Sequence, residues 1–391
     1  MKRIVRIMEF IAKLTAAYIG AFFVKSFRKN MRNVWIISER GIDARDNGYF
    51  FFKYMTEHHP EQPIWYVIDS KSADFQKVEC TGRWIEYGSF KHYCIYALAK
   101  VRISSSFWGG DLPHADYFKK LRKYIGRNKK FVFLKHGIIK DYLPQHCYGA
   151  GYPDIYVCGA KPEYDYVRSN FGYPDGVVKY LGLVRFDNLY NAETKNQILF
   201  MPTFRKWLVG MSDDELLRSD FFMAWQKAIQ DVRLIKQLEE HNLKLVFYPH
   251  IMLQKKVHLF HTNSDHVSIA SFQEYDVQTL LKESKLLVTD FSSVFFDFGY
   301  MEKPVVYYQF DTERYIREHY DFTKGYFRYE RDGFGDITSN VDSLVEAISQ
   351  CIYHDFKLSD QYRQRIADFF PLKDRKNCER IYKEIMLLQK Q

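Results

Sequence analysis

The stretch Lys285–Tyr308, KLLVTDFSSVFFDFGYMEKPVVYY, has the pattern of a strand, a helix and a second strand. Apolar runs of strand length flank a segment apolar enough to form a buried helix, and Lys303-Pro304 ends that helix because proline cannot continue it. The pattern predicts one unit of a mostly parallel α/β sheet. Its pieces are a strand at 286–288, a polar elbow at 289–293, a helix at 294–301 and a strand at 305–308.

The elbow is rich in hydroxyl groups, and Ser292 or Ser293 is a natural N-cap for the helix that follows. A helix that starts at the carboxyl edge of a parallel sheet presents backbone N–H groups and the positive end of its dipole, which suits a phosphate. The alternative is a capped core helix that binds no ligand, as most serine-capped helices do. The residues alone leave both interpretations open.

Chain length and composition indicate a globular protein with two domains. The 391 residues are enough for two domains of about 100–200 residues each. The net charge is +9, and residues 1–30 contribute +6 of it, which argues against a nucleic-acid-binding face on the rest of the chain. The six cysteines show no CxxC pair, which favours reduced thiols in the cytoplasm over a disulfide framework.

Residues 1–30 predict an amphipathic helix with basic residues at both ends and aromatic residues between them. Its uncharged run, 14–24, is well short of the ~20 residues that span a bilayer. We expect the helix to lie on the surface of an anionic membrane. The alternative is a helix packed on the first domain or on a partner subunit. A second basic stretch, 117–133, predicts a solvated helix face or a surface for lipid headgroups.

Alternating strand-like and helix-like segments predict two Rossmann-like domains after this helix. The first spans 31–190 and the second 191–391, because a new strand, 197–201, begins there. Asp374–Lys390 has the pattern of a final helix, and similar folds return their last helix to the first domain. Ligands of such sheets collect at the carboxyl ends of the strands, so polar residues that follow strands are the candidates for chemistry.

Four polar side chains that follow predicted strands suit phosphoryl transfer. His136 follows the strand 131–135, and an imidazole can take a proton from an attacking hydroxyl near neutral pH. Thr203 and Arg205 follow the strand 197–201, and the planar guanidinium group suits phosphate. His250 closes the strand 243–248. Because a lone histidine at a strand end is more often structural, the residues alone do not assign these roles.

Further polar residues are candidates for supporting roles. Asp290 would shape the elbow, and Asp297 would contact the donor or hold the turn by hydrogen bonds. Four more would contact a substrate or brace loops: Asp46, Asn47, Arg185 and Asp187. No acidic triad predicts a metal site, and the absence of a Walker A loop and of GxGxxG argues against nucleoside triphosphatases and dinucleotide oxidoreductases.

Six short motifs in order resemble the CDP-glycerol glycerophosphotransferase family, which builds teichoic acids and related polyol-phosphate capsules. TDFSSVFFDF followed by KPVVYYQFD resembles the donor-binding signature of that family. The other five are ARDN at 44–47, KHG at 135–137, GLVRFD at 182–187, MPTFR at 201–205 and YPH at 248–250. Together the six motifs span roughly residues 33 to 330.

The resemblance implies a glycosyltransferase-B-like fold, with two Rossmann-like domains facing across a cleft. It implies His136 as the catalytic base, and His250 as a donor to a phosphate oxygen of the leaving group. The implied donor site comprises Thr203, Arg205, His250, Asp290, Ser292 and Ser293. Around His136, Lys135 stands where relatives of the teichoic-acid primases usually have Trp, and Ile138-Ile139 stands where they have Thr-Pro, a departure that concerns the acceptor more than the reaction. In a separate departure, Pro249 precedes His250 rather than following it.

The implied reaction moves a polyol-phosphate, most simply glycerol-3-phosphate, from a CDP-polyol to a hydroxyl of a lipid-linked saccharide or a polyol-phosphate chain, releasing CMP. The implied place is the cytoplasmic face of a bacterial cell membrane, with the protein bound peripherally. No cofactor is assigned, and a requirement for a divalent metal stays open. The alternatives are ribitol-phosphate transfer, a nucleotide-sugar glycosyltransferase of the same fold, and a non-catalytic membrane-associated scaffold.

Overall fold

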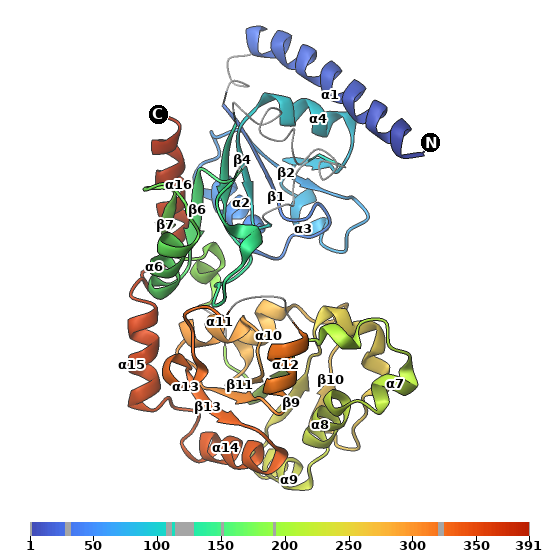
Figure 1. Cartoon of the computed structure of the whole chain (residues 1–391), viewed down its shortest axis with the longest axis vertical. Helices are drawn as coiled ribbons and strands as arrows, with labels where there is room; N and C mark the ends of the chain where they lie inside the picture. The colour runs from blue at the N-terminus through green and yellow to red at the C-terminus, as the bar shows by residue number, and fades with distance from the viewer. Residues whose placement is uncertain are drawn as a thin grey trace. The chain divides into compact units, whose positions relative to one another are not determined.

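The computed structural model describes residues 2–27, 33–106, 112–113, 129–149, 152–190, 193–319 and 324–390 (Figure 1). Most of the basic stretch 117–133 lies outside these residues. The chain divides into two compact units. Unit 1 comprises the described residues within 1–138, 144–188 and 374–391, and unit 2 comprises those within 139–143 and 189–373. The polypeptide therefore passes from one unit to the other four times.

Unit 1 contains a parallel sheet with the strand order β3-β2-β1-β4-β5-β6-β7. The strands are β1 (Val34–Ser38), β2 (Ile64–Ile68), β3 (Trp84–Glu86), β4 (Ala99–Ser104), β5 (Lys130–Phe133), β6 (Ile155–Cys158) and β7 (Val178–Tyr180). The helices are α1 (Lys2–Phe27), α2 (Asn47–His58), α3 (Gln76–Glu79), α4 (Phe90–Leu98), α6 (Lys161–Asn170) and α16 (Asn377–Leu388), with 3-10 turns η3 (Pro144–His146) and η4 (Val184–Asn188).

Unit 2 contains a second parallel sheet, with the strand order β10-β9-β8-β11-β12-β13. The strands are β8 (Gln197–Met201), β9 (Lys244–Phe247), β10 (Val267–Ile269), β11 (Leu286–Thr289), β12 (Val305–Tyr308) and β13 (Gly335–Thr338). The helices are α7 (Asp213–Leu217), α8 (Asp220–Ile229), α9 (Val232–Glu240), α10 (Val277–Glu283), α11 (Val294–Tyr300), α12 (Thr312–Glu318), α13 (Tyr329–Asp332), α14 (Val341–Tyr353) and α15 (Asp360–Phe369), with 3-10 segments η5 (Lys206–Leu208) and η6 (Ile251–Leu259).

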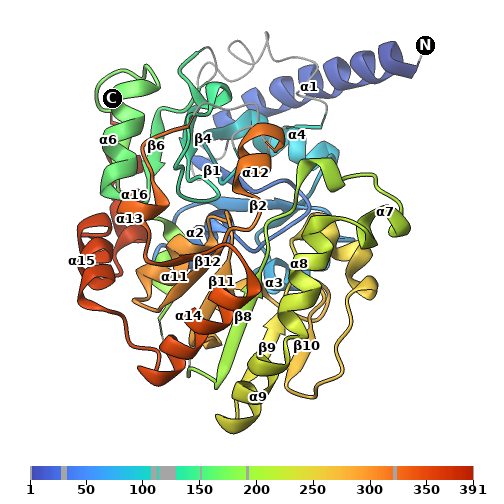
Figure 2. The same ribbon diagram turned by 60° about the horizontal axis from the view of Figure 1, so that its bottom comes forward.

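The predicted α/β class with two parallel sheets is confirmed. In both sheets the strand order reverses once, between β1 and β4 in unit 1 and between β8 and β11 in unit 2. Such a reversal leaves a crevice at the carboxyl ends of the two strands, where ligands of doubly wound sheets bind. The elbow that follows β11 lies at this point of unit 2, as Figure 2 shows for the adjacent strands β8, β11 and β12.

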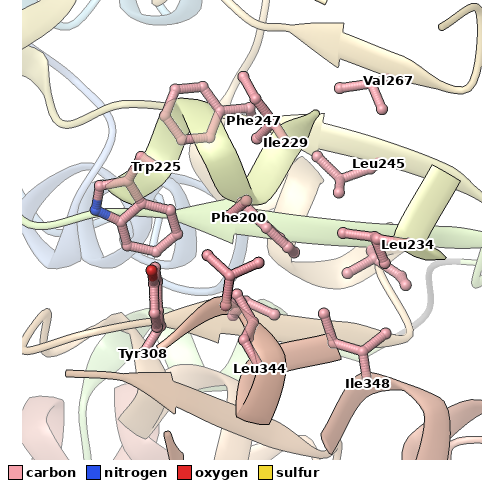
Figure 3. Packing of buried hydrophobic residues seen from close by; sticks show 14 of the residues in the cluster. Phe200, Trp225, Ile229, Leu234, Leu245, Phe247, Val267, Tyr308, Leu344 and Ile348 are labelled. Atoms are coloured by element: carbon pink, nitrogen blue, oxygen red, sulfur yellow. The ribbon is translucent and has the colours of Figure 1, made fainter. Parts of the chain in front are cut away.

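Buried side chains from helices and strands fill the core of unit 2 (Figure 3). Phe200 of β8, Trp225 of α8 and Phe247 of β9 are fully buried. The Trp225 ring meets Tyr308 of β12 edge-on, with 5.1 Å between the ring centres. This packing fixes the strands whose carboxyl ends carry the polar residues of the candidate site.

The N-terminal helix α1 is present and packs against α4 within unit 1 (Figure 2). Phe10 of α1 meets Tyr93 of α4 edge-on, at 5.8 Å between ring centres, and Ala17 and Ala21 are also buried. Other apolar side chains of α1 are exposed, among them Met8 at 66% and Phe22 at 70%. Apolar residues thus occupy both the packed and the open sides of this helix. Among the described residues, every helix is too short or too polar to cross a membrane.

Candidate active-site residues

His136 lies in the loop after β5, and its imidazole contacts Asp46, the residue before α2. Nδ1 of His136 is hydrogen-bonded to one carboxylate oxygen of Asp46, and the other oxygen accepts a hydrogen bond of 3.0 Å from Nη1 of Arg185. The same Arg185 nitrogen contacts the backbone carbonyl of His136. The His136 side chain is 88% exposed, whereas Asp46 and Arg185 are 13% exposed. Three predicted residues therefore meet around one exposed imidazole.

The charges in this group fix which nitrogen of His136 carries the proton. The carboxylate of Asp46 raises the pKa of His136, against the opposing charges of Arg185 and Arg40. Burial acts to raise the pKa of Asp46, but His136 and Arg185 outweigh it and leave that pKa below its ordinary value. Ionised Asp46 accepts a hydrogen bond from the Nδ1–H group, so Nε2 is the basic atom of the neutral ring. The arrangement suits a general base.

Asn47 and Glu39 hold the backbone around this pair. Nδ2 of Asn47 donates to the carbonyl oxygen of Lys135 at 2.8 Å, and Oδ1 of Asn47 accepts from the backbone N–H of Arg185 at 2.9 Å. Oε1 of Glu39 accepts from the backbone N–H groups of Asp46 at 2.8 Å and Tyr49 at 3.0 Å. Burial raises the pKa of Glu39 well above its ordinary value. Asn47 was predicted as a supporting residue, but Glu39 was not.

Asp187 lies in a different hydrogen-bonding group. Its two carboxylate oxygens accept from the backbone N–H groups of Asn377 at 3.1 Å and Cys378 at 2.8 Å, at the start of α16. Burial raises the pKa of Asp187. The carboxylate thus satisfies backbone donors that a helix start leaves without an intrahelical partner. It joins η4 to the last helix within unit 1.

Asp290 links the elbow after β11 to the end of β8. Its Oδ1 accepts from the backbone N–H of Thr203 at 2.8 Å and of Phe291 at 2.7 Å, and its Oδ2 forms an ion pair of 2.9 Å with Arg205. Arg205 also donates from Nε and Nη2 to the carboxylate of Asp311, both at 2.8 Å. Arg205 and Asp290 are fully buried. Two carboxylates therefore surround this guanidinium group; a contact of Arg205 with a donor phosphate stays a prediction.

The hydroxyl groups near the elbow differ in their surroundings. Oγ1 of Thr203 is buried and, within the described residues, has no hydrogen-bond partner. Ser292 and Ser293 are half-buried, and Ser293 precedes α11 without capping it through its side chain. Asp297 is buried inside α11. The three hydroxyl groups are the candidate donors to a phosphate at this edge of the sheet, and that role stays a prediction.

His250 precedes η6, and its ring orientation is defined by two contacts. Nδ1 accepts a hydrogen bond of 3.2 Å from the backbone N–H of Met252, and the ring stacks on Phe204 at 4.7 Å between centres. Because Nδ1 is an acceptor here, neutral His250 carries its proton on Nε2. That N–H is of the kind that can donate to a phosphate oxygen. The helix-capping contact and the phosphate role are compatible.

Basic groups gather around His319, a buried residue after α12 that sequence analysis did not single out. Burial, together with the charges of Arg205, Lys140 and Lys206, lowers the pKa of His319 to about 4. Carboxylates pair with two of these cations, because Arg205 contacts Asp290 and Asp311 and Lys140 contacts Asp141. The described residues contain no group of three His, Cys, Asp or Glu side chains arranged to hold a metal ion.

Solved structures resemble this chain over nearly its whole length. The wall teichoic acid polymerase TagF matches with a TM-score of 0.66 at 16% identity, over 96% of this chain and 97% of that one. A putative UDP-N-acetylglucosamine 2-epimerase from Listeria monocytogenes matches with a TM-score of 0.57 at 14% identity, over 92% of this chain and 97% of that one. At these identities the likeness shows the fold alone.

Curated relatives include the minor teichoic acid biosynthesis protein GgaB of Bacillus subtilis (strain 168), 32% identical over 92% of this chain and 40% of GgaB. The teichoic acid glycerol-phosphate transferase of Staphylococcus aureus (strain NCTC 8325 / PS 47) is 24% identical over 82% of this chain and 84% of the relative. The chain spans less than half the length of GgaB. The family model for CDP-glycerol:poly(glycerophosphate) glycerophosphotransferase matches residues 20–387. The chain therefore belongs to the CDP-glycerol:poly(glycerophosphate) glycerophosphotransferase family.

Proposed function

We propose that the chain transfers a polyol-phosphate, most simply glycerol-phosphate, from a CDP-polyol to an acceptor hydroxyl and releases CMP. Family membership supplies the reaction class. The observation that carries the proposal is the exposed imidazole of His136, hydrogen-bonded through Nδ1 to Asp46. A base of this kind suits activation of a hydroxyl nucleophile. Acceptors of the proposed class are a lipid-linked saccharide or a polyol-phosphate chain.

In the proposed reaction, the oxygen of the acceptor hydroxyl attacks the phosphorus that bears the polyol. Nε2 of His136 takes the proton of that hydroxyl. A new O–P bond forms, and the bond from that phosphorus to the bridging oxygen breaks. CMP leaves with the bonding electron pair. Asp46 stabilises the imidazolium that forms, because its carboxylate already accepts the Nδ1–H.

Unit 2 is the proposed donor-binding unit. His250 would donate from Nε2 to a phosphate oxygen and offset the negative charge that develops on the leaving group. Ser292, Ser293 and Thr203 would donate to the pyrophosphate through their hydroxyl groups. Arg205 would act by holding Asp290, and with it the elbow, through the buried ion pair of 2.9 Å.

Ribitol-phosphate is the second candidate for the transferred group. A teichoic acid poly(ribitol-phosphate) polymerase of Bacillus spizizenii (strain ATCC 23059 / NRRL B-14472 / W23) is 24% identical over 84% of this chain and 46% of the relative. Its sequence identity to this chain equals that of the Staphylococcus aureus glycerol-phosphate transferase. Sequence identity therefore does not separate the two polyols, and both donors belong in the test.

We also infer that α1 binds the cytoplasmic face of a membrane, where a lipid-linked acceptor would be reached. Met8, Ile19, Phe22 and Phe23 of α1 are each more than half exposed although they are large and apolar. Residues 1–30 also carry most of the net positive charge of the chain. Exposed apolar side chains on a basic segment suit the interface of an anionic membrane.

The reaction is tested by measuring CMP release from CDP-glycerol and CDP-ribitol, and nucleotide release from UDP-sugars, with and without an acceptor. We expect acceptor-dependent CMP release from one CDP-polyol. His136→Ala should lower it by about 10²–10⁴-fold, the usual contribution of general base catalysis. His58→Ala, on the exposed face of α2, is the matched control and should keep full activity. Turnover of a UDP-sugar with no CMP release would overturn the proposal.

A further inference from the structure

Lys135, the residue before His136, is held by contacts of its side chain and of its carbonyl group, and its backbone conformation is strained. Its side chain is 1% exposed and forms an ion pair with Glu163, which is 0% exposed. Its carbonyl oxygen accepts a hydrogen bond of 2.8 Å from Nδ2 of Asn47. Its φ of 62° lies in the left-handed region, which residues other than glycine seldom adopt. One strained residue is thus fixed directly before the exposed imidazole.

Glu163 extends this contact to the neighbouring strand. Its Oε2 accepts a hydrogen bond of 2.7 Å from the backbone N–H of Gly159, which follows β6, and Glu163 itself lies in the first turn of α6. Nζ of Lys135 also lies 5.6 Å from the ring centre of Tyr156 in β6. The Lys135 side chain therefore joins the end of β5 to the end of β6 and the start of α6.

Stability alone does not account for a buried ion pair at this position. Two charges lose their hydration on burial, and apolar side chains of similar size often stabilise a core equally well. An ion pair restrains the position of the Lys135 side chain, because the ammonium group must stay close to one carboxylate. This restraint matters here because residue 135 adopts a backbone conformation that its own Cβ disfavours.

We propose that the Lys135–Glu163 ion pair is a positioning device for His136. It holds residue 135 in the left-handed conformation, and that conformation directs the His136 ring to Asp46. Lys135 and Glu163 are positioning residues in this account, since both act through the backbone that precedes the imidazole. The inference rests on the proposed role of His136 as the base.

The test replaces both charges at once, because Glu163→Leu alone would leave a buried ammonium group without its partner. In Lys135→Met/Glu163→Leu, we expect kcat for CMP release to fall at least tenfold while the KM for the CDP-polyol stays within twofold. The pKa of the His136 ring, measured by NMR titration, should fall toward about 6.5 as its contact with Asp46 is lost. The strongest charges acting on His136 come from Asp46, Arg185 and Arg40, so a lower pKa reports movement of the ring.

A glycine variant separates positioning from packing. Lys135→Gly/Glu163→Leu leaves a larger cavity than the methionine variant, but glycine adopts a φ of about +60° without strain. If the ion pair positions His136, the glycine variant should regain the pKa of His136 and part of kcat. If the side chains only fill space, the glycine variant should have a lower kcat than the methionine variant. If neither double variant folds, kcat and the pKa of His136 are measured in Glu163→Gln, which removes the ion pair but keeps a hydrogen-bond acceptor for Lys135. Both quantities should fall, and parent values of both would overturn the inference.

The matched control is Lys179→Met/Glu384→Leu, which removes a half-buried ion pair of 3.1 Å between β7 and α16 of the same unit. It should leave kcat and the pKa of His136 unchanged. A methionine variant with the kcat and pKa of the parent protein would overturn the inference, as would a glycine variant worse than the methionine one. Because the NMR titration needs no substrate, it decides the inference even if no donor is turned over.

Discussion

Asp46 and His136 are hydrogen-bonded through a carboxylate oxygen and Nδ1, although 90 positions separate them in the chain. Helix α2 begins directly after Asp46, and His136 follows β5. Two separate connections that follow strands of the unit 1 sheet therefore supply the two members of the pair. Arg185 adds a third connection by donating to Asp46 at 3.0 Å.

Asp46→Asn should lower the activity at neutral pH and shift its pH dependence. A base must be neutral to accept a proton, so activity appears as the pH rises through the pKa of His136. Asp46 raises that pKa, and its removal should therefore move the acidic limb of kcat/KM to lower pH. We expect kcat to fall by about 10²-fold or more, because the ring loses its orienting carboxylate. Asp175→Asn, in an exposed ion pair of unit 1, should change neither quantity.

Two substitutions of His250 should separate its capping contact from its proposed catalytic role. His250→Ala removes the acceptor for Met252 N–H and should cost about 1 kcal/mol of stability. His250→Asn keeps an acceptor at the same place and should restore that stability without restoring kcat. Urea denaturation and CMP release measure the two effects. Full activity of the asparagine variant would show that the imidazole of His250 takes no part in the chemistry.

Arg205→Met should destabilise the protein strongly, because it leaves Asp290 and Asp311 without their shared buried cation. Breaking a buried ion pair in this way typically costs about 3–5 kcal/mol. Urea denaturation measures the loss. The comparison variant is Arg233→Met, whose ion pairs with Asp231 and Asp342 lie at the surface, and its midpoint should stay near that of the parent. Equal midpoints for the two variants would contradict a structural role for Arg205.

Phe22→Glu/Phe23→Glu should weaken binding to vesicles that contain anionic lipid. Each phenylalanine that leaves water contributes about 1.5–3 kcal/mol, so the pair should change the partition coefficient by at least about 100-fold. Sedimentation with vesicles measures that coefficient. Met223→Glu/Val232→Glu replaces two exposed apolar residues of unit 2 and is the control. An equal fall of the partition coefficient in both variants would assign the effect to the added negative charge rather than to α1.

His92 should make folding sensitive to acid. Burial lowers the pKa of His92 to about 3, whereas an unfolded histidine titrates near about 6.5. Between these values the unfolded chain binds a proton that the folded chain excludes, so stability falls as the pH falls from 6.5 toward 3. His92→Asn keeps an acceptor for the N–H of Gly88. Between pH 7 and pH 5, the free energy of unfolding of this variant should fall by about 2 kcal/mol less than that of the parent, as measured by urea denaturation.

The fold was predictable because its strands are short apolar runs separated by clear turn signals. The predicted strands 286–288 and 305–308 correspond to β11 and β12, and the predicted helix between them corresponds to α11. Local patterns of this kind depend on neighbouring residues only. The sequence also placed His136, Thr203, Arg205 and His250 after strands, where the structure has them.

The contacts between these residues were not predictable in the same way. Arg205 suits both phosphate and buried carboxylates, and only its burial between Asp290 and Asp311 distinguishes the two environments. The partner of His136 lies in another connection of the sheet, and one sequence carries no signal for that pairing. Glu39 could have been found, because it directly follows β1 and meets the rule that selected His136.

The four passages of the chain between the units have a practical consequence for protein engineering. Exchange of unit 2 between relatives would need junctions at 138/139, 143/144, 188/189 and 373/374. A simple fusion in the middle of the chain would leave α16 of one parent packed on the sheet of the other. Such a chimera must therefore carry the segment 139–143 with the rest of unit 2 and take the last helix from the parent that supplies β1–β7.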